Sequence, residues 1–398
     1  MVDASQVTAE AEAEEQRAGW FELFFDLVFV VTVSVLAHDL HGDPGPREFA
    51  TFLVLFFPLW WAWVNQMVTV NVFGSDPARV RAVLLAAMPA LGLMAAASPE
   101  GLGDRAWAYA LGAAWIRLLF FLLWFGRARR PGSTLPLWRP VTYCLVPAVI
   151  WGVSAAVPGP VRFVLWGLAI ALEVVLLAVQ AGISAEFYDR LKVEHMVERI
   201  GLFVVIVLGE SVFTVVATFT EHFTGLSALA ALLGFFVVAE LALIFFTWGT
   251  GAAARGLTAV QSRRAVRALR DTVMYLPFVL VSGIVVIAAA LGTAVGEPDH
   301  VLPPGARWAL SGGVLAFYTA NAAISLRYGD GLGTVMRWYV FCLVLTPGAL
   351  LPASVYLPAW GAVACAAGLV LLLAKLSKLS RARGQAAAAG AGPAAPVG

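Results

Sequence analysis

The sequence predicts an all-α polytopic membrane protein of about twelve transmembrane helices, with both termini in the cytoplasm. Hydrophobic residues make up 61% of the 398 residues and charged residues only 13%, outside the range of soluble domains. The chain contains repeated apolar stretches of about 20 residues, the length that crosses a bilayer as a helix. The number of basic residues alternates between high and low from one connection to the next, which is typical of a polytopic membrane protein.

The predicted spans follow one another with short connections. An acidic segment with Glu10, Glu12, Glu14 and Glu15 precedes the first span. Because a signal peptide needs a basic segment before its apolar stretch, we expect this span to remain as an anchor. The spans in chain order are 21–40, 50–73, 79–98, 104–126, 138–157, 161–182, 199–219, 226–250, 271–295, 307–327, 335–352 and 355–375.

The basic residues support this count of spans. With a cytoplasmic N-terminus, 21 of the 26 Lys and Arg residues fall in cytoplasmic segments, and Arg117 lies inside a span. One missed or added helix would scramble this asymmetry, which the positive-inside rule predicts for a correct topology. The opposite face holds Arg47, Arg105, Arg162 and Arg307.

The order of the spans predicts two halves. Six spans precede the mixed-charge segment 183–198 and six follow it, an arrangement compatible with a parallel 6+6 repeat. The low-complexity C-terminal sequence is typical of disorder. The predicted parts are an acidic cytoplasmic tail (1–18), a first six-helix half (19–182), a cytoplasmic interfacial linker (183–198), a second six-helix half (199–375) and a disordered Ala/Gly/Pro tail (376–398).

Composition also restricts the possible partners. The basic residues sit in short connections and form no single face, so we expect no nucleic-acid binding. Cys144, Cys342 and Cys365 lie in predicted spans without metal-ligand spacing, so we expect neither a metal site nor a cofactor. The expected partners are the lipid bilayer and a small ion or a proton.

Ionisable residues at two helix openings are the first candidates for a functional site. Glu22 and Asp26 are four residues apart and therefore on one face of the first helix. His195, Glu198 and Arg199 have the same kind of spacing at the start of the seventh span. Both helices enter from the cytoplasm, so we expect them to pack together, with Glu22 or Asp26 in reach of Arg199 or His195.

Deeper ionisable residues complete the candidates. Glu210 lies roughly 16 Å beyond Arg199 along the seventh helix, close to the bilayer midplane. Glu173 on the sixth span and Arg117 on the fourth reach similar depths, and we expect one or both beside Glu210. Glu240 and the amides Asn65 and Gln66 are further polar groups within spans.

These buried charges have two interpretations. Paired charges in a membrane can fix helix register without any activity. Carboxylates nevertheless outnumber cations within the spans, and in transporters such groups relay protons or bind cations. Gly209 beside Glu210 would allow a ligand or a neighbouring helix to approach closely.

Two sequence motifs resemble the bacterial low temperature requirement A (LtrA) membrane proteins over roughly residues 19–375. The first is Glu22-Leu-Phe-Phe-Asp26-Leu-Val-Phe29. The second is His195-Met-Val-Glu198-Arg199 running into Leu208-Gly209-Glu210-Ser211, with Trp60-Trp-Ala-Trp63 and Ala171-Leu-Glu173 between the two. The chain departs from the family pattern at 245–249 and lacks the family's histidine near 274–277, so no role is carried over there.

The resemblance implies a bacterial cell-membrane protein linked to growth in the cold, without a settled activity. We expect a transporter or ion-conducting protein that uses the buried carboxylates as a proton or cation site, rather than an enzyme. Two alternatives stay open. One is a membrane-embedded enzyme acting on a lipid or isoprenoid headgroup at the cytoplasmic face. The other is a structural or stress-adaptation protein whose polar groups only lock helices.

Overall fold

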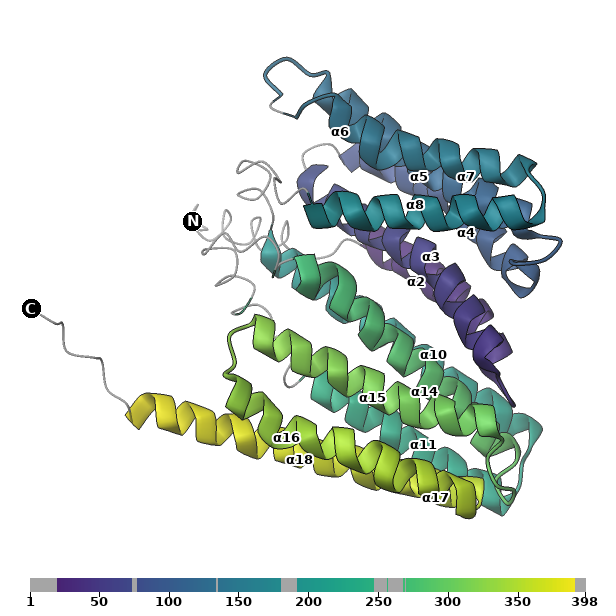
Figure 1. The fold of residues 1–398 in the computed structure, drawn as a ribbon, viewed down its shortest axis with the longest axis vertical. Coiled ribbons are helices and arrows are strands. Elements are labelled where there is room, and N and C mark those ends of the chain that lie inside the picture. The colour runs from purple at the N-terminus through teal and green to yellow at the C-terminus, as the bar shows by residue number, and fades with distance from the viewer. Residues whose placement is uncertain are drawn as a thin grey trace, which may run out of the picture. The chain divides into compact units, whose positions relative to one another are not determined.

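The described part of the protein is built almost entirely of helices (Figure 1). The computed structural model describes residues 20–73, 77–133, 135–179, 192–246 and 270–390, together with residues 256 and 268. Eleven helices in these ranges are long and apolar enough to cross a membrane. The only β-pairing in the described ranges is an isolated bridge between Val301 and Pro358. The chain is therefore an all-α polytopic membrane protein, as the sequence predicts.

The chain divides into two compact units. The first comprises residues 1–39, 49–206 and 260–274, and the second comprises 40–48, 207–259 and 275–398. The division falls within α10, whereas the sequence places the boundary between halves at 183–198. Residues 183–191 of that segment lie outside the described ranges, and the 6+6 repeat stays a prediction.

The first unit contains the helices of the first six predicted spans. Proline begins α3 and α4, where its missing N–H is not needed by the helix. Pro58 and Pro89 lie inside these same two helices. The elements are α2 (Trp20–Ala37), α3 (Pro46–Phe73), α4 (Pro77–Ala97), α5 (Ala106–Ala128), α6 (Trp138–Pro140), a π-helical segment (Val141–Leu145), α7 (Val146–Ala156), α8 (Gly159–Val179) and the beginning of α10 (Val193–Glu221).

The predicted span 138–157 is an interrupted helix. Its α7 portion has only 11 residues, too few to cross a bilayer, but α6 and the π-helical segment extend it without a break back to Trp138. Pro140 and Pro147 flank the π-helical turn, which accommodates prolines that cannot donate backbone hydrogen bonds. Together with the eleven candidate spans of the described ranges, this segment matches the predicted number of twelve.

The second unit contains the remaining helices. Thr224 caps α11, because its side chain accepts a hydrogen bond from Ser227 N at 3.1 Å. The elements are the rest of α10, α11 (Gly225–Ile244), α14 (Leu276–Gly296), α15 (Pro304–Arg327), α16 (Leu332–Leu345), a π-helical segment (Thr346–Leu350), α17 (Leu351–Tyr356) and α18 (Ala359–Gly390). A further π-helical segment, Asp271–Tyr275, lies in the first unit up to Met274 and leads into α14.

Small residues set the close approach of α14 and α15. A Cβ at Gly283 would lie 2.9 Å from Gly313 O, and a Cβ at Gly313 would lie 2.9 Å from Gly283 O. Glycine at both positions therefore lets the two backbones touch, as is common between membrane helices. On the other side of α15, Tyr318 Oη donates to Val370 O of α18 at 2.9 Å.

The C-terminal helix is longer than the sequence analysis expects. Disorder is predicted from residue 376, yet α18 continues to Gly390. Ser380 Oγ donates to Thr334 O at 2.6 Å, and Arg381 Nη2 donates to Ser325 Oγ at 2.8 Å. The predicted boundary is too early, because these contacts and the high helix propensity of alanine extend the last span.

Candidate functional site

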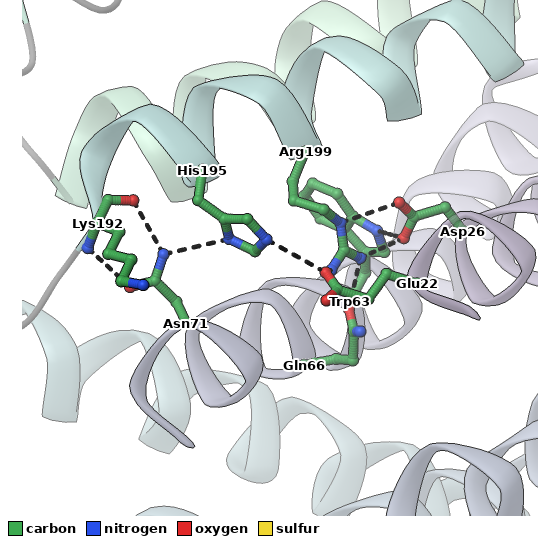
Figure 2. A network of polar contacts seen from close by, with 8 residues as sticks. All are labelled: Glu22, Asp26, Trp63, Gln66, Asn71, Lys192, His195 and Arg199. Atoms are coloured by element: carbon green, nitrogen blue, oxygen red, sulfur yellow. Dashed lines mark hydrogen bonds and ion pairs between the residues drawn. The ribbon is translucent and has the colours of Figure 1, made fainter. Parts of the chain in front are cut away.

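A network of polar side chains joins α2, α3 and α10 within the first unit (Figure 2). Arg199 of α10 lies at its centre and is fully buried. We call the following residues the Arg199 cluster: Glu22, Asp26, Trp63, Gln66, Asn71, His195 and Arg199. Each helix contributes residues at helical spacing, because Glu22 and Asp26, like His195 and Arg199, are four residues apart and share a face.

Arg199 binds both acidic residues of α2. Its Nε lies 3.1 Å from Asp26 Oδ2 and its Nη2 lies 2.6 Å from Asp26 Oδ1, so this pair is bidentate. Its Nη1 donates to Glu22 Oε2. Its Nη2 also donates to Gln66 Oε1 of α3 at 2.9 Å. This confirms the contact that the sequence predicts between the first helix and the start of the seventh span.

Aromatic residues cover the cluster at Asp26, its fully buried carboxylate. Trp63 Nε1 donates to Asp26 Oδ1 at 2.8 Å, so both oxygens of this carboxylate accept hydrogen bonds. The Trp63 ring packs against Phe203 of α10, with ring centroids 4.5 Å apart, and against Trp60 at 5.0 Å. This apolar layer excludes water from Asp26, which strengthens its attraction to Arg199.

His195 links Glu22 to the end of α3. Its Nε2 lies 3.4 Å from Glu22 Oε2, and its Nδ1 lies 3.4 Å from Asn71 Nδ2. Asn71 also pairs with the backbone of Lys192, donating to its carbonyl and accepting from its N–H, both at 2.9 Å. The Asn71 amide thus satisfies backbone groups just before α10, which begins at Val193.

The order of contacts gives the direction of the three helices. Going along α2 from Glu22 to Asp26, the partner on α10 changes from His195 to Arg199. The partners on α3 run in the opposite sense, since Trp63 contacts Asp26 whereas Asn71 contacts His195. The segments of α2 and α10 in the cluster are therefore parallel and α3 is antiparallel to them, as alternating membrane spans require.

The cluster holds more negative than positive charge. Glu22 and Asp26 are carboxylates, and Arg199 is the cation that both contact. His195 adds a positive charge only when it is protonated. With neutral His195 these four side chains carry a net charge of −1. They lie on α2 and α10, which are both long and apolar enough to cross a membrane.

Arg117 and Glu173 form a separate pair within the first unit. Arg117 Nε lies 2.6 Å from Glu173 Oε1 and Nη2 lies 2.9 Å from Oε2, and both side chains are buried. Arg117 Nη1 donates to Ala113 O, and the guanidinium stacks over the Trp151 ring at 5.2 Å. Opposite charges are matched one to one here, which favours the structural interpretation for these two predicted site residues.

The other predicted site residues lie along α10. Glu198 directly precedes Arg199 and is half-buried. Glu210 is half-buried in the second unit, so its predicted position beside Glu173 or Arg117 stays a prediction. A Cβ at Gly209 would meet nothing within 4 Å, so close helix packing does not explain this glycine. Among the described residues, no group of three or more His, Cys, Asp and Glu side chains could hold a metal ion.

Three members of the cluster are not among the predicted site residues. They are Trp63, Gln66 and Asn71, all on α3. Gln66 is noted in the sequence as a polar group within a span but without a role, and Asn71 is a further amide of the same apolar span, which is the signal that could have identified it. Their spacing alone does not show which other helix they face.

The two motifs that supply the charged residues of the cluster agree with a comparison to known families. The model of the bacterial low temperature requirement A protein (LtrA) family matches residues 17–375. The chain belongs to the LtrA family. The first motif of this LtrA protein supplies Glu22 and Asp26, and the second supplies His195 and Arg199, so the fold joins motifs that are 173 positions apart at Asp26 and Arg199.

A curated relative gives no further functional detail. An uncharacterized protein of Rhizobium meliloti (strain 1021) is 30% identical to the LtrA protein over 210 residues, 51% of each chain. The chain thus spans about half the length of the curated relative that it matches. No solved structure matches the chain significantly.

Proposed function

We propose that this LtrA protein is a transporter or ion-conducting protein of the bacterial cell membrane, and that the Arg199 cluster is its proton or cation site. The observation that supports this is the charge of the cluster. Two carboxylates, Glu22 and Asp26, contact one guanidinium within apolar helices. Taking up one proton or one cation would neutralise the site, and buried charges of this kind mark ion pathways in many membrane proteins.

The difference in exposure between the two carboxylates supports exchange of an ion with solution at the Glu22 end of the cluster. The Asp26 carboxylate is fully buried, whereas the Glu22 side chain keeps 16% of its surface exposed. Glu22 lies in the first turn of α2 and contacts His195, which lies in the first turn of α10. An ion could therefore reach Glu22 from the membrane surface while Asp26 stays paired with Arg199.

The enzyme alternative has less support from the geometry. A cytoplasmic site for a lipid or isoprenoid phosphate would need a cation free to bind the phosphate. Arg199 instead donates hydrogen bonds to Glu22, Asp26 and Gln66. These acceptors would have to release the guanidinium before it could bind a phosphate.

The test is ion flux in proteoliposomes. Purified protein is reconstituted, and imposed gradients of H⁺, Na⁺ and K⁺ are followed with internal dyes. We expect flux in the wild type that is lost in Glu22→Gln, which removes the exposed carboxylate of the cluster. Asp104→Asn removes an exposed acid in the connection before α5 and should leave flux unchanged.

A second variant tests the deeper carboxylate. Glu210→Gln should abolish the pH dependence of flux while folded protein remains in the membrane, if Glu210 takes part in the working cycle. Unchanged flux and unchanged pH response would assign Glu210 to structure. Wild-type vesicles that carry none of the three ions would contradict the proposed function itself.

A further inference from the structure

We infer that the ion bound by the Arg199 cluster is a proton, taken up at Glu22, and not a metal cation, and that the Gln66 amide holds a water molecule within the cluster. This inference rests on the proposed function for the movement of the ion, but it concerns binding and can be tested without transport. Three features of the cluster support it. They are the carboxylate oxygens that already accept hydrogen bonds, the fixed orientation of His195, and the Gln66 amide nitrogen, which has no acceptor among the described residues.

The first feature is the shortage of free oxygen ligands. Asp26 Oδ1 accepts hydrogen bonds from Trp63 and Arg199, and Asp26 Oδ2 accepts from Arg199. Glu22 Oε2 accepts from Arg199 and contacts His195. Glu22 Oε1 is the remaining carboxylate oxygen, and no described residue donates to it. One oxygen without a donor among the described residues suits a proton, whereas hard cations such as Ca²⁺ take about six to eight oxygen ligands.

The second feature is the orientation of His195. The two hydrogen bonds between Asn71 and the Lys192 backbone fix the amide, because exchanging its oxygen and nitrogen would set donor against donor. The Asn71 N–H₂ group therefore faces His195 Nδ1, which must accept. His195 Nε2 then carries the ring proton and faces Glu22 Oε2. Neither ring nitrogen offers a free lone pair to a metal ion.

The third feature is the Gln66 side chain, which is fully buried. Its Oε1 accepts from Arg199, so its Nε2 is fixed as a donor, and no described residue accepts from that atom. A buried donor without an acceptor costs about 1–3 kcal/mol, so an acceptor other than the described residues is expected. A cation would be repelled by this donor. An anion would be repelled by a cluster of net charge −1.

A water molecule satisfies these conditions. It can accept a hydrogen bond from Gln66 Nε2, since ordered waters commonly satisfy buried polar groups. On uptake, a proton from solution binds Glu22 Oε1, His195 keeps its Nε2 proton, and the charge of the cluster changes from −1 to zero.

Few other charged side chains surround Glu22 in the described part of the chain. Residues 60–73 of α3, which face the cluster, contain no ionisable group. Helix α4 packs against α2 and contributes Arg79 and Arg81 in its first two turns, both exposed. On α10 the neighbours are His195, Glu198 and Arg199. Arg199 is thus the buried cation that offsets the negative charge of Glu22 until a proton binds there.

The test is infrared difference spectroscopy on the full-length protein in lipid nanodiscs. One arm changes pH at constant Na⁺ and K⁺, and the other changes Na⁺ or K⁺ at constant pH. We expect the acid step to produce a carboxylic-acid carbonyl band that is lost in Glu22→Gln. We expect Gln66→Leu to shift this band, because the bound water is lost. Asn65→Leu should not shift it, since Asn65 donates to Trp61 O and lies outside the cluster.

Two results would overturn the inference. The first is a change in carboxylate bands of the wild type on adding Na⁺ or K⁺ at constant pH, which needs no variant to fold. The second is an acid-step band that persists in folded Glu22→Gln. Vesicles without flux, together with an intact Glu22 band, would instead reject transport and leave proton binding supported.

Discussion

Arg199 holds both oxygens of Asp26, with Nε 3.1 Å from Oδ2 and Nη2 2.6 Å from Oδ1, although 173 positions separate the two residues. Neither side chain retains solvent-exposed surface. Both oxygens of Asp26 accept hydrogen bonds, so this pair anchors α2 to α10. The described partners of Glu22, the second carboxylate of α2, all contact its Oε2. One guanidinium thus binds a fully buried carboxylate and a partly exposed one.

Removing Arg199 should strongly destabilise the protein. Arg199→Met leaves the fully buried Asp26 and the half-buried Glu22 without their cation, and breaking a buried pair costs about 3–5 kcal/mol. We expect a large loss of folded protein when the variant is heated in detergent. Size-exclusion chromatography after heating measures the folded fraction that remains. Arg105→Met is the matched control, because Arg105 and Glu100 are half-exposed and such pairs contribute about 1 kcal/mol or less. Equal melting of the two variants would contradict a structural role for Arg199.

The Arg117–Glu173 pair should act as a structural ion pair that holds helices together, and not as an ion-binding site. Arg117→Met alone should destabilise the protein by about 3–5 kcal/mol, because Glu173 is left buried and unpaired. Arg117→Met combined with Glu173→Leu should recover most of this loss, since apolar replacement of a whole buried pair is often neutral. Thermal melting of the single and double variants measures the effect. A folded double variant without ion flux would show that the pair does more than hold helices together.

Glycine contacts between α14 and α15 should be sensitive to a single methyl group. Gly283→Ala places a Cβ 2.9 Å from Gly313 O, a backbone atom, so we expect a loss of about 1–3 kcal/mol from overpacking. Gly209→Ala is the control, because its Cβ would meet nothing within 4 Å and alanine is the better helix former. Thermal melting should therefore separate the two variants. A Gly283→Ala protein as stable as the wild type would show that the helix pair can shift apart at little cost.

The predicted sidedness can be measured directly in cells. Alkaline phosphatase is active only outside the cytoplasm, so we expect a fusion after residue 265 to be inactive and a fusion after residue 300 to be active. The expectation follows from the positive-inside rule and the excess of basic residues in the predicted cytoplasmic segments. The reverse pattern would invert the topology and place Glu22 at the outer surface.

Part of the site could be predicted because it depends on local spacing. The interval from Glu22 to Asp26 and that from His195 to Arg199 each define one helix face, and sidedness placed both faces at the same membrane surface. The contact between them followed from the need to pair charge in an apolar medium. The role of Gln66 could not be predicted, because it depends on which of its two amide atoms meets Arg199.

The sequence by itself determined the properties that depend on neighbouring residues along the chain. These are the apolar stretches long enough to span a membrane, the bias of basic residues to one side, and the two motifs that identify the LtrA family. Only the tertiary structure decided which charges meet. It paired Arg117 with Glu173 one to one, but gave Arg199 two carboxylates. Residue spacing defines the face of a helix, whereas the partner of that face depends on how each helix is rotated against the others, and side-chain packing sets that rotation.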